Sequence, residues 1–265
     1  MAMPAYLDTI VAAHRAGAAS DHRDLSATVA RAVSAGPIRP FESALRQAYD
    51  RRGMAVISEI KRRSPSRGDL DPDLDPARVA TEYESGGAAC LSVLTDHEFF
   101  GGAPEDLKQA REACTLPVLR KDFTVGPLDV CDARIMGADA VLLIAAALDD
   151  TELTTCLETA RTCSLTALVE VHDRAELDRA VAAGARVIGV NQRDLRTFEV
   201  DRGRARDLGR AMPDDVLAVA ESGIRGADDV AALASAGYHA VLVGESLVTS
   251  GDRRTAVAGL LGAPR

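Results

Sequence analysis

The amino-acid sequence predicts an α/β protein built as a closed (β/α)8 TIM barrel with an N-terminal helical extension. Eight short runs rich in Val, Ile and Leu recur along the chain, with helical periodicity between them. Gly residues follow several of these helical segments, as is typical of helix ends. A length of 265 residues suits one such barrel. An open doubly wound sheet is the alternative, but eight strands and no Gly-x-Gly-x-x-Gly after the first strand favour the barrel.

The repeat begins after a prefix of 50 residues. In the prefix we expect helices over 4–19 and 25–34 and a third from Phe41, so that residues 1–50 pack on a catalytic barrel of residues 51–265. The predicted strands are 54–60, 89–95, 117–122, 140–146, 166–171, 187–191, 216–221 and 240–244. The predicted helices between them are 76–85, 104–114, 127–136, 150–163, 174–183 and 227–236. Pro in the first turn of the second and third of these helices is a start signal.

Composition excludes several classes of partner. There are 40 acidic and 31 basic residues, giving a net charge of −9, which argues against nucleic-acid binding. No uncharged apolar run reaches the roughly 18 residues of a membrane span, and the N-terminus lacks a signal-peptide pattern. Five cysteines without a Cys-x-x-Cys pair indicate a reducing cytoplasm. The five histidines are scattered, so we expect no metal site. We also expect no cofactor, a cytoplasmic location and a monomeric protein.

Polar side chains stand at the carboxyl ends of five of the predicted strands. Strand geometry with a period of two places Glu59 and Lys61 on one face, above Ala55 and Ile57. The other polar residues are Lys121, Glu170, Asn191, Arg193 and Glu221, and the aromatic Phe123 lies on the same face as Lys121. In a TIM barrel these ends converge on one mouth. A single strand-end charge is often part of a salt bridge, but five strands ending this way favour an active site.

Lysines and carboxylates at close quarters control each other's protonation, which suits general acid–base catalysis on a small polar or anionic substrate. The last two strands end in small residues, Ser222-Gly223 and Gly244-Glu245-Ser246. Loops at these positions commonly bind phosphate through backbone N–H groups, so a phosphate site is predicted there. Because a carboxylate repels phosphate, Glu245 is expected to point away and to contribute only its N–H.

Several segments resemble, in the same order, motifs of the indole-3-glycerol phosphate synthase family of tryptophan biosynthesis. They are ISEIKRRSPSRG (57–68), LSVLTD (91–96) with FFGG (99–102), LRKDF (119–123), LVEVH (168–172), GVNQRDL (189–195) and AESGI (220–224). The resemblance runs from about Phe41 to Leu261, whereas the first 40 residues match poorly.

The resemblance implies a carbon–carbon lyase that closes the ring of 1-(2-carboxyphenylamino)-1-deoxyribulose 5-phosphate, an anionic aromatic sugar phosphate, with loss of carbon dioxide and water. It further implies roles for individual residues. Lys121 is the expected donor to the ketone oxygen, and Lys61 with Glu170 is available as the acid–base pair for dehydration, but the sequence does not decide which lysine acts at which step. Glu59 and Asn191 orient the lysine and the substrate hydroxyls, with Ser222 and Glu221 in support. Phe123 stacks on the aniline ring, and Ser64 or Arg193 receives the carboxylate.

Two other functions remain open at this stage. One is another sugar-phosphate enzyme on the same scaffold, such as a phosphoribosylanthranilate isomerase, because folds are shared across chemistries. Such isomerases use an Asp/Cys pair, and no Cys ends a strand at the predicted mouth. The other is a non-catalytic barrel that binds an anionic metabolite, against which the two lysines and Glu170 argue.

Overall fold

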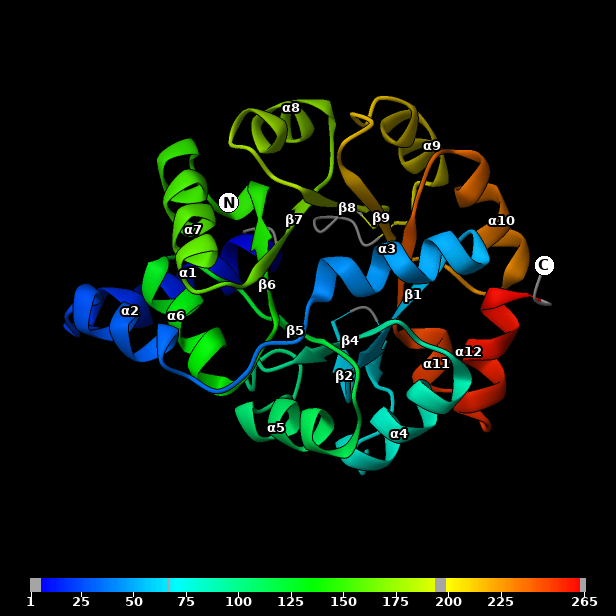
Figure 1. Ribbon diagram of the computed structural model, residues 1–265, viewed down its shortest axis with the longest axis horizontal. Coiled ribbons are helices and arrows are strands. Elements are labelled where there is room, and N and C mark those ends of the chain that lie inside the picture. The colour runs from blue at the N-terminus through cyan, green and yellow to red at the C-terminus, as the bar shows by residue number, and fades with distance from the viewer. Residues whose placement is uncertain (1–5, 66, 194–198, 263–265) are drawn as a thin grey trace, which may run out of the picture.

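The computed structural model describes residues 6–65, 67–193 and 199–262. Eight parallel strands form a closed barrel in the order β1-β10-β9-β8-β7-β6-β5-β4, with helices outside it (Figure 1). β1 pairs with both β4 and β10, which closes the sheet and excludes the open doubly wound alternative. The TIM-barrel prediction is therefore confirmed. Residues 4–5, 66 and 194–195, which fall within predicted segments, lie outside the described residues.

Each barrel strand overlaps one predicted run. The strands are β1 (Ala55–Ile60), β4 (Cys90–Leu94), β5 (Val118–Lys121), β6 (Ala140–Ile144), β7 (Thr166–Val171), β8 (Val187–Asn191), β9 (Leu217–Glu221) and β10 (Ala240–Val243). Successive residues alternate between two apolar clusters. Ala55 and Ile57 belong to the one inside the barrel, and Val56 and Ile60 to the one under the helices. Parallel strands buried on both faces explain why the runs are almost continuously apolar.

The helices around the barrel are α4 (Pro76–Gly86), α5 (Pro104–Ala113), α6 (Pro127–Met136), α7 (Asp150–Thr162), α8 (Arg174–Ala182), α9 (Arg202–Arg210), α10 (Ala227–Ser235) and α12 (Arg253–Leu261). The predicted ranges include neither α9 nor α12; the α9 segment RGRARDLGR is highly charged, and only Ala205, Leu208 and Gly209 in it are buried. Asp201 caps it by accepting from the N–H groups of Gly203 and Arg204. The short elements β2 (Arg63–Ser64), β3 (Gly68–Asp69), the 3₁₀ turn η1 (Ala145–Ala147) and α11 (Glu245–Val248) were also not predicted.

The three prefix helices lie close to their predicted positions, as α1 (Tyr6–Ala19), α2 (Leu25–Val33) and α3 (Phe41–Arg52). α3 crosses the amino end of the barrel (Figure 1), where Phe41 and Leu45 are fully buried in the interior cluster. α2 packs against α6. α1 reaches the opposite end, because Arg15 pairs with Glu152 in α7 and donates to the carbonyl of Ala147. The prefix therefore touches both ends of the barrel.

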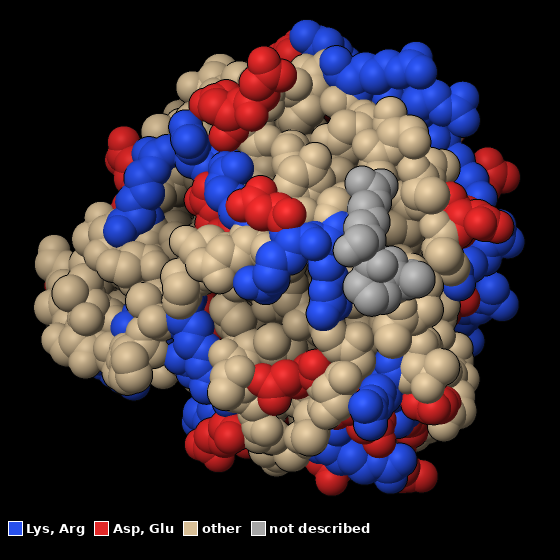
Figure 2. Space-filling view, turned by 45° about the vertical axis from the view of Figure 1, so that its right-hand side comes forward, with Lys and Arg blue, Asp and Glu red and all other residues tan. Residues whose placement is uncertain are grey.

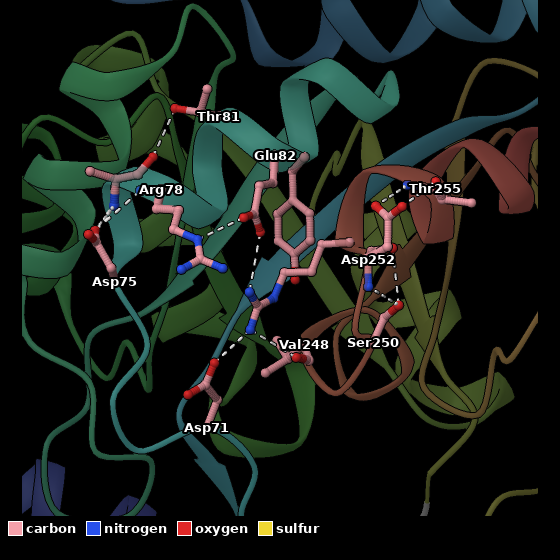
Figure 3. A network of polar contacts seen from close by, with 12 residues as sticks. Asp71, Asp75, Arg78, Thr81, Glu82, Val248, Ser250, Asp252 and Thr255 are labelled. Carbon is pink, nitrogen blue, oxygen red and sulfur yellow. Dashed lines mark hydrogen bonds and ion pairs between the residues drawn. The ribbon is translucent and has the colours of Figure 1, made fainter.

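One buried arginine ties the loop after β1 to the last helix. The Arg253 guanidinium lies 2.6 Å from Asp71 and 3.2 Å from Glu82, and it donates to the carbonyl of Val248 at 3.1 Å; the three partners are labelled in Figure 3. The side chain of Arg253 is only 12% exposed, so these charges are poorly screened. The network joins the segment after β1 to the segment after β10, the neighbouring strand of the barrel.

Charged side chains of both signs lie next to each other on the face shown in Figure 2. All five cysteines are free thiols and all are buried. Within the described part of the chain, the helices are too short or too polar to cross a bilayer.

Candidate active site

A cavity of about 500 Å³ opens at the carboxyl ends of the barrel strands. All fourteen residues that the sequence analysis assigned to the site line it: Glu59, Lys61, Ser64, Lys121, Phe123, Glu170, Asn191, Arg193, Glu221, Ser222, Gly223, Gly244, Glu245 and Ser246. The chain contains three lysines, and two of them line this cavity. The predicted convergence of strand ends is thus present in the structure.

Lys121 lies between two carboxylates from distant strands. Its Nζ is 2.7 Å from Glu170 Oε2 and 3.3 Å from Glu221 Oε2. The side chains of both glutamates are 2% exposed and that of Lys121 is 14% exposed. An ammonium group in so little water is favoured only because negative charge surrounds it.

These three groups change each other's pKa values in different directions. Burial acts to lower the pKa of Lys121, but the carboxylates of Glu170, Glu221 and Glu59 outweigh it and raise the pKa. Burial acts to raise the pKa of Glu170, and the opposing charge of Lys121 lowers it below its usual range. For Glu221, burial prevails, and the neighbouring Glu170 and Glu59 charges add to it, so its pKa is raised. The site therefore holds one ammonium, one ionised carboxylate and one carboxyl group that retains its proton more readily.

A second lysine–carboxylate pair comes from β1 and the loop that follows it. Lys61 Nζ lies 2.5 Å from Glu59 Oε1. The carbonyl of Glu59 accepts from the Tyr83 hydroxyl at 3.2 Å, which anchors the end of the strand. At Gly244, an added Cβ would lie 2.5 Å from Glu59 Oε1, so only Gly leaves room for this carboxylate.

Two residues of β8, Asn191 and Gly189, position the carboxylates of Glu170 and Glu221. Asn191 Nδ2 donates to Glu170 Oε1 at 3.0 Å, while its Oδ1 accepts from the backbone N–H of Arg193 at 3.0 Å. A Cβ on Gly189 would overlap Glu221 Oε1. The glycine in the strand is therefore explained by the carboxylate that lies against it.

The loop after β9 has the backbone of an anion site. Ser222 and Gly223 both have positive φ, 66° and 70°, and a Cβ on Gly223 would overlap Val200. Successive residues in such a conformation turn backbone N–H groups toward a common point. Ser246, at the start of α11, lies beside this loop, because its hydroxyl donates to the carbonyl of Ile224 at 3.1 Å.

The Glu245 carboxylate is neutralised at the rim of the cavity. It lies 3.0 Å from Arg67 Nε and 3.8 Å from Arg193. The sequence analysis expected repulsion between this carboxylate and phosphate, and two guanidinium groups offset that repulsion. Arg67 was not among the predicted site residues, since it follows a loop rather than a strand.

Aromatic and apolar residues form the side of the cavity near β5. The ring of Phe123 lies 6.0 Å from that of Phe100 and 5.5 Å from that of His14. Three residues of α1 also line the cavity: Tyr6, Leu7 and Ile10. Sequence reasoning missed them because an apolar helix face predicts packing rather than a substrate contact.

His14 joins α1 to the carboxyl ends of β4 and β5. Its Nε2 lies 3.1 Å from Asp96 Oδ2 and 3.9 Å from Asp122 Oδ1. These three groups are close enough to hold a cation. However, Asp122 also pairs with Arg120 at 2.9 Å, and Asp96 accepts from the N–H of Phe99 at 2.7 Å. We therefore interpret the cluster as the attachment of α1 to the barrel.

The chain is similar to proteins of known activity over nearly its whole length. The model of the family "Indole-3-glycerol phosphate synthase" matches residues 7–260. The expectation that the first 40 residues match this family poorly is therefore wrong. An indole-3-glycerol phosphate synthase of Mycobacterium ulcerans is 48% identical over 96% of this chain and 93% of its own. Indole-3-glycerol phosphate synthase 2 of Streptomyces coelicolor is 52% identical over 87% of this chain and 88% of its own.

Solved structures give a more distant match. A thiamine phosphate pyrophosphorylase of Pyrococcus furiosus superimposes with a TM-score of 0.59 at 18% identity, covering 79% of this chain and 95% of that one. At such identity the likeness concerns the barrel fold alone.

Proposed function

The chain belongs to the indole-3-glycerol phosphate synthase family, and on that premise we propose roles for the residues of its cavity. The enzyme is a carboxy-lyase of tryptophan biosynthesis. It closes the ring of 1-(2-carboxyphenylamino)-1-deoxyribulose 5-phosphate and releases carbon dioxide and water, forming indole-3-glycerol phosphate. The observation that carries the residue assignment is the bridge from the Lys121 ammonium to Glu170 and Glu221.

Lys121 is the general acid of ring closure. The aryl carbon that bears the carboxylate attacks the ketone carbon, and the ketone oxygen must take up a proton as the new carbon–carbon bond forms. The carboxylates around Lys121 outweigh its burial and raise its pKa, so the side chain is an ammonium group at neutral pH. The carbon–carboxylate bond then breaks, and its electron pair restores the aromatic ring as carbon dioxide leaves.

Lys61 and Glu170 perform the dehydration. The hydroxyl made in the first step leaves as water after receiving a proton from Lys61, and Glu170 removes a proton from the ring system so that the indole double bond forms. Glu59 orients Lys61 at 2.5 Å, and Asn191 orients Glu170 at 3.0 Å. Ser222 and Glu221 support this arrangement from β9 and the residue after it.

The remaining residues bind the two ends of the substrate. Phe123 stacks on the aniline ring, and Ser64 or Arg193 receives its carboxylate. The phosphate binds to the N–H groups of the two loops after β9 and β10, which contain Gly223, Gly244, Glu245 and Ser246. Positive φ at Gly223 and the neutralised Glu245 support this placement.

The organisation of the chain is proposed on the same basis. Residues 1–50 form an extension on a catalytic barrel of residues 51–265, supported by the contacts of α1 and α3 with the two ends of the barrel. We also propose that the protein is a monomer. Five unpaired buried thiols support a reducing cytoplasm as the site of action.

An activity assay tests the proposal directly. The purified protein is incubated with the carboxyphenylamino-deoxyribulose phosphate in the presence of a chelator and without nucleotide, and indole fluorescence is followed. We expect saturable turnover, and Lys61→Met and Glu170→Gln should each lower kcat more than they raise KM. Folded protein that yields no indole product would contradict the function, and variants with unchanged kcat would contradict the assigned roles.

A further inference from the structure

His172 lies behind Glu170, on the side away from Lys121, and the mechanism above does not use it. Its Nε2 is 3.5 Å from Glu170 Oε1, whereas Lys121 contacts the other oxygen, Oε2. The side chain is 13% exposed. Within the described residues, Nε2 is buried and makes no hydrogen bond. A buried ring nitrogen facing a catalytic carboxylate needs an explanation.

Glu176 fixes the orientation of the imidazole from the first turn of α8. Its Oε2 lies 3.1 Å from His172 Nδ1 and also accepts from the backbone N–H of His172 at 2.7 Å. With its proton on Nδ1, a neutral imidazole would turn the lone pair of Nε2 toward the oxygen of Glu170. The imidazolium instead places an N–H there, so the geometry favours the charged form.

The charges around the cavity support the same protonation state. Glu59, Glu170 and Glu221 are three carboxylates, but Lys61 and Lys121 supply only two ammonium groups among them. One carboxylate must keep a proton unless a third cation is present, because like charges in a buried site cannot all ionise. His172, which Glu176 also faces, is the titratable group beside Glu170 that can supply positive charge.

His172 also makes the surroundings of Glu170 and Glu221 different, although Lys121 contacts both carboxylates. Lys121 contacts both Glu170 and Glu221, and both are fully buried. His172 forms its ion pair with Glu170, while Glu221 Oε1 has no hydrogen-bond partner within the described residues. When one of these two carboxylates takes up a proton, Glu221 is therefore the more favourable site for it than Glu170.

We propose that His172, held by Glu176, is a positioning residue that keeps Glu170 ionised as the base of the dehydration step. The titratable groups that face His172 are Glu170 from its own strand, Glu176 from α8 and Glu221 from β9. Burial acts to lower the pKa of His172, but these carboxylates outweigh it and raise the pKa. This inference rests on the proposed role of Glu170, and the experiment below separates the two.

The test compares the pH dependence of kcat in His172→Gln, Glu176→Gln and the double variant with that of the wild type. Loss of the imidazolium raises the pKa of Glu170, so the acid limb of the profile should move to higher pH. A charge a few ångströms away shifts a carboxylate by roughly one pH unit or more. At pH values above the shifted acid limb, kcat of each variant should stay close to that of the wild type, because Glu170 is ionised at these pH values in every variant.

Glu176→Gln should shift the limb in the same direction by a smaller amount, since it weakens the charge on His172 without removing the ring. The double variant should match His172→Gln, because Glu176 acts only through His172. NMR titration of the His172 ring in the wild type and in Glu176→Gln measures the charge directly. His22→Gln, at an exposed histidine in the α1–α2 turn, is the matched control and should change nothing.

Each outcome supports or overturns the inference. A uniform loss of kcat at every pH, with the acid limb in place, would show that His172 only fills space. A neutral His172 ring at pH 6 in the NMR titration would overturn the inference even if His172→Gln did not fold. Glu170→Gln is measured alongside. If it keeps the wild-type kcat, the role of Glu170 fails; if it loses kcat while the His172 profiles are unchanged, only the present inference fails.

Discussion

Replacing Lys121 with Met removes the ammonium group from between Glu170 and Glu221 while keeping a side chain of similar length. Two carboxylates that are each 2% exposed then lose their common cation. At an effective dielectric constant of about 20, unit charges separated by 2.7 Å and 3.3 Å attract by roughly 6 and 5 kcal/mol. Most of this attraction offsets the cost of burying the charges, so the net effect is smaller.

Breaking a buried ion pair typically lowers the free energy of unfolding by about 3–5 kcal/mol. We expect a loss of about 3 kcal/mol for Lys121→Met, the lower end, because Glu221 already has a raised pKa and can take up a proton. The effect on catalysis is separate. Loss of a positioned general acid should lower kcat by about 10²–10⁴-fold.

Indole fluorescence measures kcat, and urea unfolding measures stability. Lys108→Met is the matched control, since Lys108 is the third lysine of the chain and lies exposed on α5. Lys121→Met with Glu221→Gln should recover part of the lost stability, because one stranded carboxylate is removed, but none of the lost kcat. A Lys121→Met variant within tenfold of the wild-type kcat would refute the role of Lys121 as acid.

Three further substitutions test the surrounding geometry. Gly189→Ala forces the Glu221 carboxylate aside, so kcat should fall by about tenfold or more and the unfolding free energy by about 1–3 kcal/mol. Gly223→Ala strains a residue at φ 70°, so KM should rise several-fold more than kcat falls, and an equal loss in both would argue against a phosphate site there. The hydrogen bond to Asp96 outweighs burial and raises the pKa of His14. A raised pKa in the folded state stabilises the protein fully below the pKa of the unfolded chain, about 6.5, and this contribution is lost as pH rises through the folded value. His14→Gln should therefore reduce stability at pH 5.5 more than at pH 9 in thermal unfolding, whereas an equal loss would show that the imidazole is neutral.

The polar residues at the strand ends could be predicted from the sequence, because alternation along a strand depends only on neighbouring residues. Alternation along β1 fixes that Glu59 and Lys61 share a face with Ile57, and barrel closure brings such ends together. Which lysine pairs with which glutamate could not be predicted from this alternation. Lys121 pairs with Glu170, 49 residues away, and with Glu221 from β9, and this choice of partners depends on strand tilt and on neighbours across the barrel.

The N-terminal helix shows a different limit. Periodicity predicts α1 well, but nothing in an apolar helix face distinguishes a contact with substrate from a contact with the barrel, so Tyr6 and Ile10 were missed. His14 was discounted as one of five scattered histidines, and its partners Asp96 and Asp122 could not be identified because they lie far away in sequence. α9 was missed because its buried face is only a few residues wide. In each case the determining contact is a tertiary one.

The claim that Lys121 and Glu170 depend on each other through their ion pair at 2.7 Å, although they act in different steps, is tested most directly by a double-mutant cycle on kcat. Lys121→Met, Glu170→Gln and the double variant are assayed for indole formation at one pH. Groups that depend on each other lose nearly all of their contribution when either is removed, so the double variant should be no slower than the slower single variant. Losses that multiply in the double variant would contradict the account, because they would show that the ammonium and the carboxylate contribute independently.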